Sequence, residues 1–129
     1  MYSFTKQKLK CYKTEFLECP DIIRVTNKNL PFINGVYSIT SQIRRQRPVW
    51  YNNEKNKFVF VSVNKKWHIA NSEEYNLDTD ISWAFANFGN GKASCPQNLD
   101  YKLWLNNKWT EGTDLSVIAG MHDFWFSVF

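Results

Sequence analysis

Aromatic side chains are the residues whose type and spacing most clearly suit chemistry in this chain, and that chemistry is binding. The 129 residues include six Trp, six Tyr and ten Phe, which is more rings than one small core readily hides. A flat ring on a rigid strand can stack against the apolar face of a sugar at little cost in conformational entropy. The same rings could instead fill the core of a thin sheet. The candidate rings are Trp50, Trp67, Trp83, Trp104 and Trp109, with Tyr37 and Tyr51. The predicted ligand-binding residues among them are Trp50, Trp67, Trp104, Trp109 and Tyr51.

Basic residues form a second set that could bind a ligand. Three arginines fall within one predicted loop, and two adjacent lysines lie at a later turn. Guanidinium groups suit phosphate or sulfate, and neighbouring rings could stack on nucleic-acid bases. An ordinary solvated loop is the other interpretation of the same residues. The predicted anion-binding residues are Arg44, Arg45, Arg47, Lys65 and Lys66.

Patterns typical of catalysis or metal binding are weak. One acidic segment could carry the paired carboxylates of a glycoside hydrolase, although such loops are usually only solvated. Its carboxylates are Glu73, Glu74, Asp78 and Asp80. The two histidines, His68 and His122, have no second His or Cys at a metal-ligand spacing. We therefore predict no catalytic residue, no metal site and no cofactor.

The net charge of +4 is unevenly distributed along the chain. Residues 1–70 contain 13 Lys and Arg against 4 Asp and Glu, whereas residues 71–129 contain 3 against 8. The two halves could face each other in the fold. They could also give a dipolar surface that steers an anionic partner.

Short aromatic and β-branched segments, separated by turn-forming residues, predict the elements that must position these side chains. The length and the hydrophobic content of 43% fit one domain with a single core. We expect an all-β fold: an antiparallel meander of short strands that forms either a folded sheet or a small open barrel. The predicted strands are 22–25, 36–40, 49–51, 58–63, 66–70, 81–87, 101–105, 108–110 and 115–118.

Turn signals predict how these strands are connected. Asn34-Gly35 is the strongest two-residue turn signal. Residues 41–47 and 71–80 are expected to be loops, the first basic and the second acidic, and no segment shows sustained helical periodicity. The strand 58–63 is apolar on both faces, which predicts a central position in the sheet.

Three cysteines, Cys11, Cys19 and Cys95, allow two interpretations. A Cys19–Cys95 bridge would tie the start of the strand-rich region to its later part and could stabilise the fold by about 4 kcal/mol. Cys11 would then be free or paired between chains. Alternatively, all three are reduced thiols in a cytoplasmic protein.

A recurring order of features covers about residues 19–118. It consists of Cys19, Asn34-Gly35-Val36-Tyr37, Arg47-Pro48-Val49-Trp50, the aromatic strand Phe58–Phe60, Trp67-His68-Ile69, Cys95-Pro96, Trp104 and Trp109. This order resembles a cysteine-bracketed β module of secreted and cell-surface proteins. The resemblance implies an extracellular setting and a non-catalytic role in binding or architecture.

The chain therefore divides into three predicted parts. Residues 1–18 are a basic arm or an edge strand, residues 19–118 are the β module, and residues 119–129 are an apolar strand or tail that could mediate self-association. No stretch is long and apolar enough for a membrane span, and residues 1–10 contain no apolar run typical of a signal peptide.

Three functions follow from these patterns, in order of preference. The first is a non-enzymatic recognition module, extracellular or at the cell surface, with a protein or glycan partner. The second is an intracellular binder of a polyanion or nucleic acid that uses the loop 44–47. The third is a carboxylate-dependent hydrolase.

Overall fold

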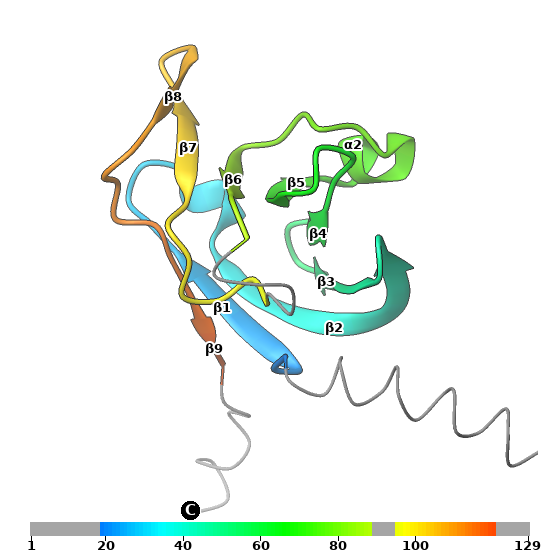
Figure 1. Cartoon of the computed structure of the whole chain (residues 1–129). Helices are drawn as coiled ribbons and strands as arrows, with labels where there is room; N and C mark the ends of the chain where they lie inside the picture. Colours follow the sequence, from blue (N-terminus) through cyan, green and yellow to red (C-terminus); the bar gives the residue numbers. More distant parts are fainter. Residues whose placement is uncertain (1–18, 89–94, 121–129) are drawn as a thin grey trace, which may run out of the picture.

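A computed structural model describes residues 19–88 and 95–120. These residues form one antiparallel sheet of nine strands in the order β8-β7-β6-β5-β4-β3-β2-β1-β9, curled into a half-barrel (Figure 1). The predicted all-β meander is confirmed, and β9 returns from the end of the chain to pair with β1. The strands are β1 (Ile22–Thr26), β2 (Gly35–Arg44), β3 (Arg47–Asn52), β4 (Lys57–Val61), β5 (Trp67–Asn71), β6 (Ala84–Ala86), β7 (Lys102–Leu105), β8 (Lys108–Thr110) and β9 (Ser116–Ala119).

The long strand β2 makes the bend that curls the sheet. Its first half pairs with β1 and its second half with β3, and the register of the β2–β3 pair shifts between Ile39 and Ile43. Thr40 Oγ1 donates to Val49 O at 2.8 Å and accepts from Gln42 N at 3.0 Å within this irregular stretch. Such a bulge bends the strand that carries it and increases the local twist.

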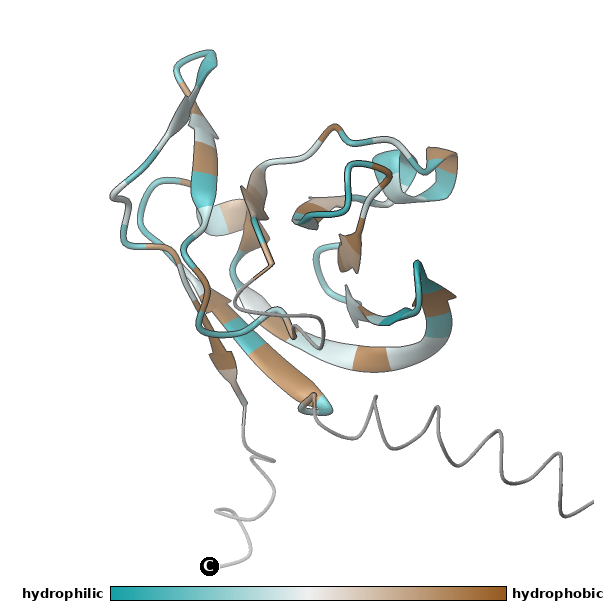
Figure 2. Cartoon of the chain, viewed as in Figure 1, coloured by the Kyte–Doolittle hydropathy of each residue, from teal (hydrophilic) through white to brown (hydrophobic). Residues whose placement is uncertain are grey.

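The central strand β4 contributes to apolar clusters on both faces of the sheet, as its sequence predicts. Val59 and Val61 face the main core, which is built from buried side chains of every strand except β8 and includes Trp50 and Trp67. Phe60 faces the opposite way, into a smaller cluster. Hydrophobic and hydrophilic residues alternate along β1, which has only one buried face (Figure 2).

A short helix, α2 (Ser72–Leu77), covers the smaller cluster and replaces part of the acidic loop predicted for residues 71–80. Tyr75 of this helix stacks on Phe58 with ring centroids 4.0 Å apart, and the guanidinium of Arg44 lies 3.9 Å from the Tyr75 ring centroid. The helix forms because its one buried residue is held between these partners. In addition, two carboxylates in its first turn interact favourably with the positive end of the helix dipole.

Two predicted connections differ from the structure. Residues 41–47 are not a loop, because β2 continues to Arg44 and β3 starts at Arg47, with only Arg45 and Gln46 in the turn. Both turn residues have positive φ angles, 51° and 65°, although arginine and glutamine do not favour such angles. This left-handed turn is compatible with the twist of a tight β-hairpin.

Asn34-Gly35 is not a two-residue turn. A short 3-10 helix, η1 (Pro31–Ile33), precedes it, and Gly35 is already the first residue of β2. Glycine is needed there because its φ is +141° and because a Cβ atom would lie 2.5 Å from Asn52 Nδ2. Gly35 therefore allows β2 and β3 to approach each other closely.

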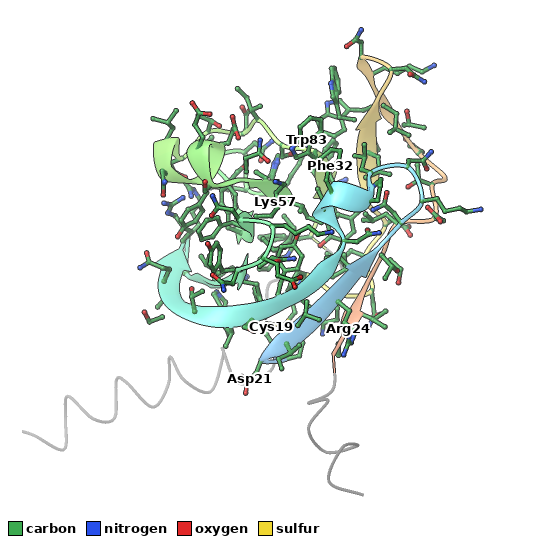
Figure 3. All side chains as sticks on the ribbon, turned by 180° about the vertical axis from the view of Figure 1, so that it is seen from behind. Cys19, Asp21, Arg24, Phe32, Lys57 and Trp83 are labelled. Atoms are coloured by element: carbon green, nitrogen blue, oxygen red, sulfur yellow. A yellow bond between two sulfur atoms is a disulfide. The ribbon has the colours of Figure 1, made fainter. Side chains whose placement is uncertain are left out.

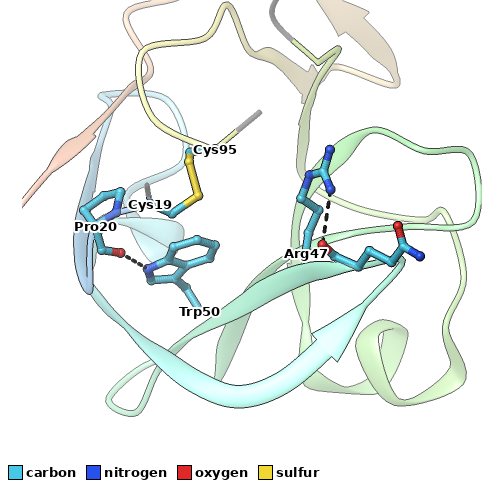
Figure 4. Close-up of a disulfide and its surroundings, with 6 residues drawn as sticks. Cys19, Pro20, Arg47, Trp50 and Cys95 are labelled. Carbon is cyan, nitrogen blue, oxygen red and sulfur yellow. Dashed lines mark hydrogen bonds between the residues drawn. A yellow bond between two sulfur atoms is a disulfide. The ribbon is translucent and has the colours of Figure 1, made fainter. Parts of the chain in front are cut away.

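The disulfide Cys19–Cys95 closes the core at one end, so the bridged alternative for these cysteines holds (Figure 4). It joins the segment before β1 to the segment before β7, 76 residues apart in the chain. Beside it, Trp50 Nε1 donates to Pro20 O at 3.0 Å.

The predicted arm 1–18 with Cys11, and residues 121–129 of the predicted tail, lie outside the described residues. In the part of the chain that is described, no helix is long and apolar enough to cross a membrane.

Candidate functional site

Three tryptophans converge on one hollow of about 510 Å³, which we call the tryptophan cleft. The cleft is lined by residues of α2, of the segment that follows it and of the β7–β8 hairpin. These elements lie in the upper part of Figure 1. Its volume falls in the range of sites that bind small ligands. The rings and polar groups that define the cleft are Trp83, Trp104, Trp109, Asn71, Glu74 and Asp80.

The β7–β8 hairpin presents two of the three rings. Trp104 and Trp109 are directly paired across the hairpin, and their ring centroids are 5.1 Å apart in an edge-to-face arrangement. Asn106 and Asn107 make the turn with φ angles of 51° and 64°. Trp109 is 38% exposed, and the ring of Phe85 supports it at 4.6 Å. The hairpin predicted around these two asparagines is confirmed.

Trp83 is the third ring, and four contacts hold it in place. Its backbone N donates to Ile69 O at 2.9 Å, and its O accepts from Trp104 N at 2.9 Å. Its indole Nε1 donates to Asn71 Oδ1 at 3.1 Å. Phe32 meets the indole edge-on with ring centroids 4.8 Å apart, and Figure 3 shows these two labelled residues side by side. A ring fixed in this way loses little entropy on binding a ligand.

Ser82 lines the cleft and belongs to a hydrogen-bond network with a buried histidine. His68 Nε2 lies 3.0 Å from Asn64 Oδ1, and its Nδ1 lies 2.5 Å from Ser82 Oγ. Since an amide oxygen only accepts, Nε2 carries the hydrogen of the neutral ring. His68 Nδ1 and Ala84 O, which lies 3.1 Å from Ser82 Oγ, then compete for the single hydrogen of the serine hydroxyl. Burial lowers the pKa of His68 to about 4, against the weaker opposing charge of Asp80, so the ring is neutral near pH 7.

The contacts run from serine to histidine to asparagine, the order of residues in a catalytic triad, but the electrostatics of this network are unfavourable for catalysis. The imidazole has 1% of its surface exposed, and its low pKa makes it a weak base. Asn64 carries no charge that could stabilise an imidazolium ion. We therefore interpret the network as the support that fixes one wall of the cleft.

The four carboxylates of the acidic segment are separated by the fold. Glu74 and Asp80 line the cleft, and no salt bridge to either is found within the described residues. Glu73 is exposed outside the cleft. Asp78 binds Arg45 Nη2 at 2.6 Å and Arg44 Nη1 at 3.1 Å, and the hydrogen bond from Arg45 is the main reason that its pKa is lowered.

Trp50 and Trp67 cannot belong to an exposed binding surface, and this part of the predicted ring set is corrected. Both have 0% of their surface exposed, and their rings meet edge-to-face at 5.8 Å in the core. Tyr51 is half-buried outside the cleft, where it packs on Phe58 and donates to Asn56 Oδ1 at 2.9 Å. Only Trp104 and Trp109 of the predicted set lie in the cleft.

The predicted anion-binding arginines are engaged within the fold. Arg44 and Arg45 hold Asp78, and Arg45 Nη1 also donates to Val61 O at 3.0 Å. Arg47 lies over the ring of Phe88 at 5.3 Å, and its Nη1 donates to Gln46 O (Figure 4).

The two predicted lysines differ from each other. Lys65 is an exposed residue in the turn before β5, with a positive φ of 63°. Lys66 is half-buried and lies over the Phe85 ring at 4.8 Å. The five basic residues therefore do not present one free cationic surface.

Sequence reasoning missed three members of the cleft: Asn71, Ile81 and Ser82. Trp83 was one of the candidate rings but was not among the predicted ligand-binding residues, because its strand pattern is also that of a core residue. An asparagine followed within three residues by two glutamates, as Asn71 is by Glu73 and Glu74, is a typical helix start. A helix predicted from that signal would have brought the side chains of Asn71 and Glu74 close together. Among the described residues, no group of three or more His, Cys, Asp or Glu could hold a metal ion.

Comparison with known proteins gave no match to any protein-family model, curated protein or solved structure. The resemblance to a cysteine-bracketed module therefore stays a prediction, and the function must be argued from the tryptophan cleft itself.

Proposed function

We propose that this protein is a non-enzymatic recognition module that binds a glycan in the tryptophan cleft. One observation supports this proposal above the others: three indoles from separate backbone positions converge with two carboxylates on one hollow. Indole faces suit the C–H faces of a pyranose ring, while carboxylate and amide groups accept and donate hydrogen bonds to its hydroxyls.

A glycan fits the cleft better than a folded protein partner does. The hollow of about 510 Å³ is a concave site with a few convergent polar groups, as small-ligand sites are. Stable protein–protein interfaces are larger patches, with about 800 Å² buried on each partner. A protein could still bind through one protruding side chain, and the experiments below separate that case.

An extracellular or cell-surface setting belongs to the same proposal. The Cys19–Cys95 disulfide supports it, because such bonds persist in oxidising compartments and are rare in the cytosol. The alternative of an intracellular polyanion binder has less support, since Arg44 and Arg45 are occupied by Asp78.

The test is a screen of oligosaccharides immobilised on an array, with the wild-type protein and the Trp109→Ala variant. Trp109 is the most solvent-exposed of the three cleft tryptophans, so its removal should leave the fold intact while taking away a stacking surface. We expect at least one neutral or charged oligosaccharide to bind and the variant to lose about tenfold in affinity or more.

A matched control is Ile43→Ala, which removes an apolar side chain that is 55% exposed and does not line the cleft. This variant should bind as the wild-type protein does. Loss of binding in both variants, or no binding of any glycan by the wild-type protein, would contradict the proposal.

A carboxylate-dependent glycoside hydrolase is a second candidate, because Glu74 and Asp80 line the same cleft as the rings. Such an enzyme would release new reducing ends from a bound oligosaccharide. Glu74→Gln and Asp80→Asn would then abolish product formation while leaving stacking on Trp109 in place. A recognition module releases no product under the same conditions.

A further inference from the structure

We propose that the tryptophan cleft selects an amino sugar, meaning a glycan unit with a free, protonated amine. This inference rests on the proposed glycan-binding function and adds the chemical class of the ligand. It follows from the charges that line the cleft, from the positions of nearby cations and from the faces of the rings.

The cleft is lined by two acidic side chains and by no basic one. Glu74 comes from α2 and Asp80 from the segment that follows it, so two separate backbone positions direct negative charge to the same hollow. Neither carboxylate has a salt-bridge partner among residues 19–88 and 95–120. A ligand with an ammonium group would supply the missing cation and form charge-assisted hydrogen bonds.

Three lysines lie over rings that support the cleft tryptophans. Lys66 and Lys102 lie over Phe85, at 4.8 Å and 5.6 Å from its centroid, and Lys102 Nζ also pairs with Glu111 at 3.2 Å. Lys57 lies over Phe32 at 5.9 Å, and its Nζ donates to Lys55 O at 3.1 Å. None of the three lines the cleft or forms a salt bridge with Glu74 or Asp80 among the described residues.

The indoles add a second attraction for the same group. An ammonium held near the face of a Trp ring is attracted by the ring quadrupole, and Trp is the best of the three aromatic residues for this contact. A neutral sugar gains from stacking and from hydrogen bonds to its hydroxyls, whereas an amino sugar gains in addition from the attraction of its ammonium group to the ring faces and to the carboxylates. Selection should therefore depend on the amine and not on the pyranose ring.

The experiment compares three oligosaccharides of equal length by isothermal titration calorimetry at about pH 6. The probes are the fully deacetylated glucosamine tetramer, the fully N-acetylated tetramer and the tetramer of β-linked glucose. At that pH an amine with a pKa near that of an α-amino group, about 7.7, is protonated. A short peptide containing lysine serves as a second source of an ammonium group.

We expect the deacetylated tetramer to bind about tenfold more tightly than either neutral tetramer, and its affinity to fall with added salt. Glu74→Gln and Asp80→Asn should each remove most of that advantage. Glu73→Gln is the matched control, because it removes the neighbouring carboxylate of the same helix, which is exposed and does not line the cleft. It should leave the preference unchanged.

Each other outcome overturns the inference in a distinguishable way. Equal or tighter binding of the neutral tetramers, lost in Trp109→Ala, would leave the glycan-binding function intact and refute selection of an amine. Binding of the lysine peptide alone would refute the glycan source. Binding of none of the probes, together with no binding on the oligosaccharide array, would refute both proposals.

Discussion

The buried and the exposed tryptophans of this protein form two regions built from the same residue type. Trp50 and Trp67 pack against each other in the core, on strands that have a neighbour on each side. Trp104 and Trp109 lie on β7 and β8, the last two strands at one edge of the sheet. Rings in the middle of the sheet are covered on all sides, whereas rings on the terminal hairpin line the cleft.

The difference shows that position in the sheet, and not residue type, separates the buried tryptophans from those that line the cleft. In the core the indole Nε1 of Trp50 is satisfied by Pro20 O, next to the disulfide. In the cleft the indole Nε1 of Trp83 is satisfied by Asn71, a residue that itself lines the hollow. Both rings are fixed, but only the second belongs to a surface that a ligand can reach.

Removing a core ring should have the largest effect on stability. We expect Trp67→Ala to lower the free energy of unfolding by about 3–5 kcal/mol, because it leaves a cavity in a close-packed region. Trp109→Ala should cost only about 1 kcal/mol, since its ring is partly solvated. Urea denaturation of both variants measures the contrast. Equal losses would show that the two regions do not differ as described.

Removing the disulfide should have the next largest effect. We expect the Cys19→Ala, Cys95→Ala double variant to lose about 2–4 kcal/mol, because a bridge across 76 residues restricts the unfolded chain. The midpoint of thermal unfolding checks this, with glycan binding recorded below that midpoint. The bridge lies by the core and not by the cleft, so affinity should be retained. Lost affinity in a folded variant would refute that separation.

Lowering the pH should destabilise the wall of the cleft through His68. The folded ring has a pKa of about 4, whereas the unfolded ring titrates near its usual 6.5, so the unfolded state binds more protons between these values. Stability that is complete above pH 6.5 should therefore fall by up to about 3 kcal/mol as the pH decreases to 4. Urea midpoints measured across this range test the slope.

His68→Gln is the control for that slope, because glutamine does not titrate. Its stability should vary less with pH in the same window, whatever its absolute value. An identical slope in the variant would assign the pH dependence to another group.

The smallest effect is expected at Asp78, which does not line the cleft. Asp78→Asn weakens the pairs with Arg44 and Arg45, which are partly solvated, and should cost about 1 kcal/mol. Because the lowered pKa of Asp78 makes the native carboxylate favourable, its contribution is present above its unfolded pKa and is lost as the pH falls through its lower folded value. If Arg44 and Arg45 bind a polyanion, their release from Asp78 should also raise the affinity of the protein for heparin.

The sequence predicted the strands well because their signals are local. The apolar residues on both faces of β4 correctly predicted a central strand, and the Asn106-Asn107 turn correctly predicted the β7–β8 hairpin. The Arg45-Gln46 turn was missed because neither residue favours a positive φ. Helix α2 was missed because its six residues are too few to show periodicity.

The cleft was only half predictable, for a different reason. Trp104 and Trp109 were included among the candidate rings, but so were Trp50 and Trp67, because exposure depends on which strands lie beside a ring. The approach of Glu74 and Asp80 to those rings depends on contacts between segments that are distant in the chain. Such proximity has no local signature in one sequence.

The most direct test of the account is the oligosaccharide array probed with wild-type protein, Trp109→Ala and Ile43→Ala. The account predicts that the wild-type protein and Ile43→Ala bind the same glycans, and that Trp109→Ala remains folded but binds at least about tenfold more weakly. Glycan binding that survives in Trp109→Ala, or a wild-type protein that binds no glycan, would contradict the assignment of recognition to the tryptophan cleft.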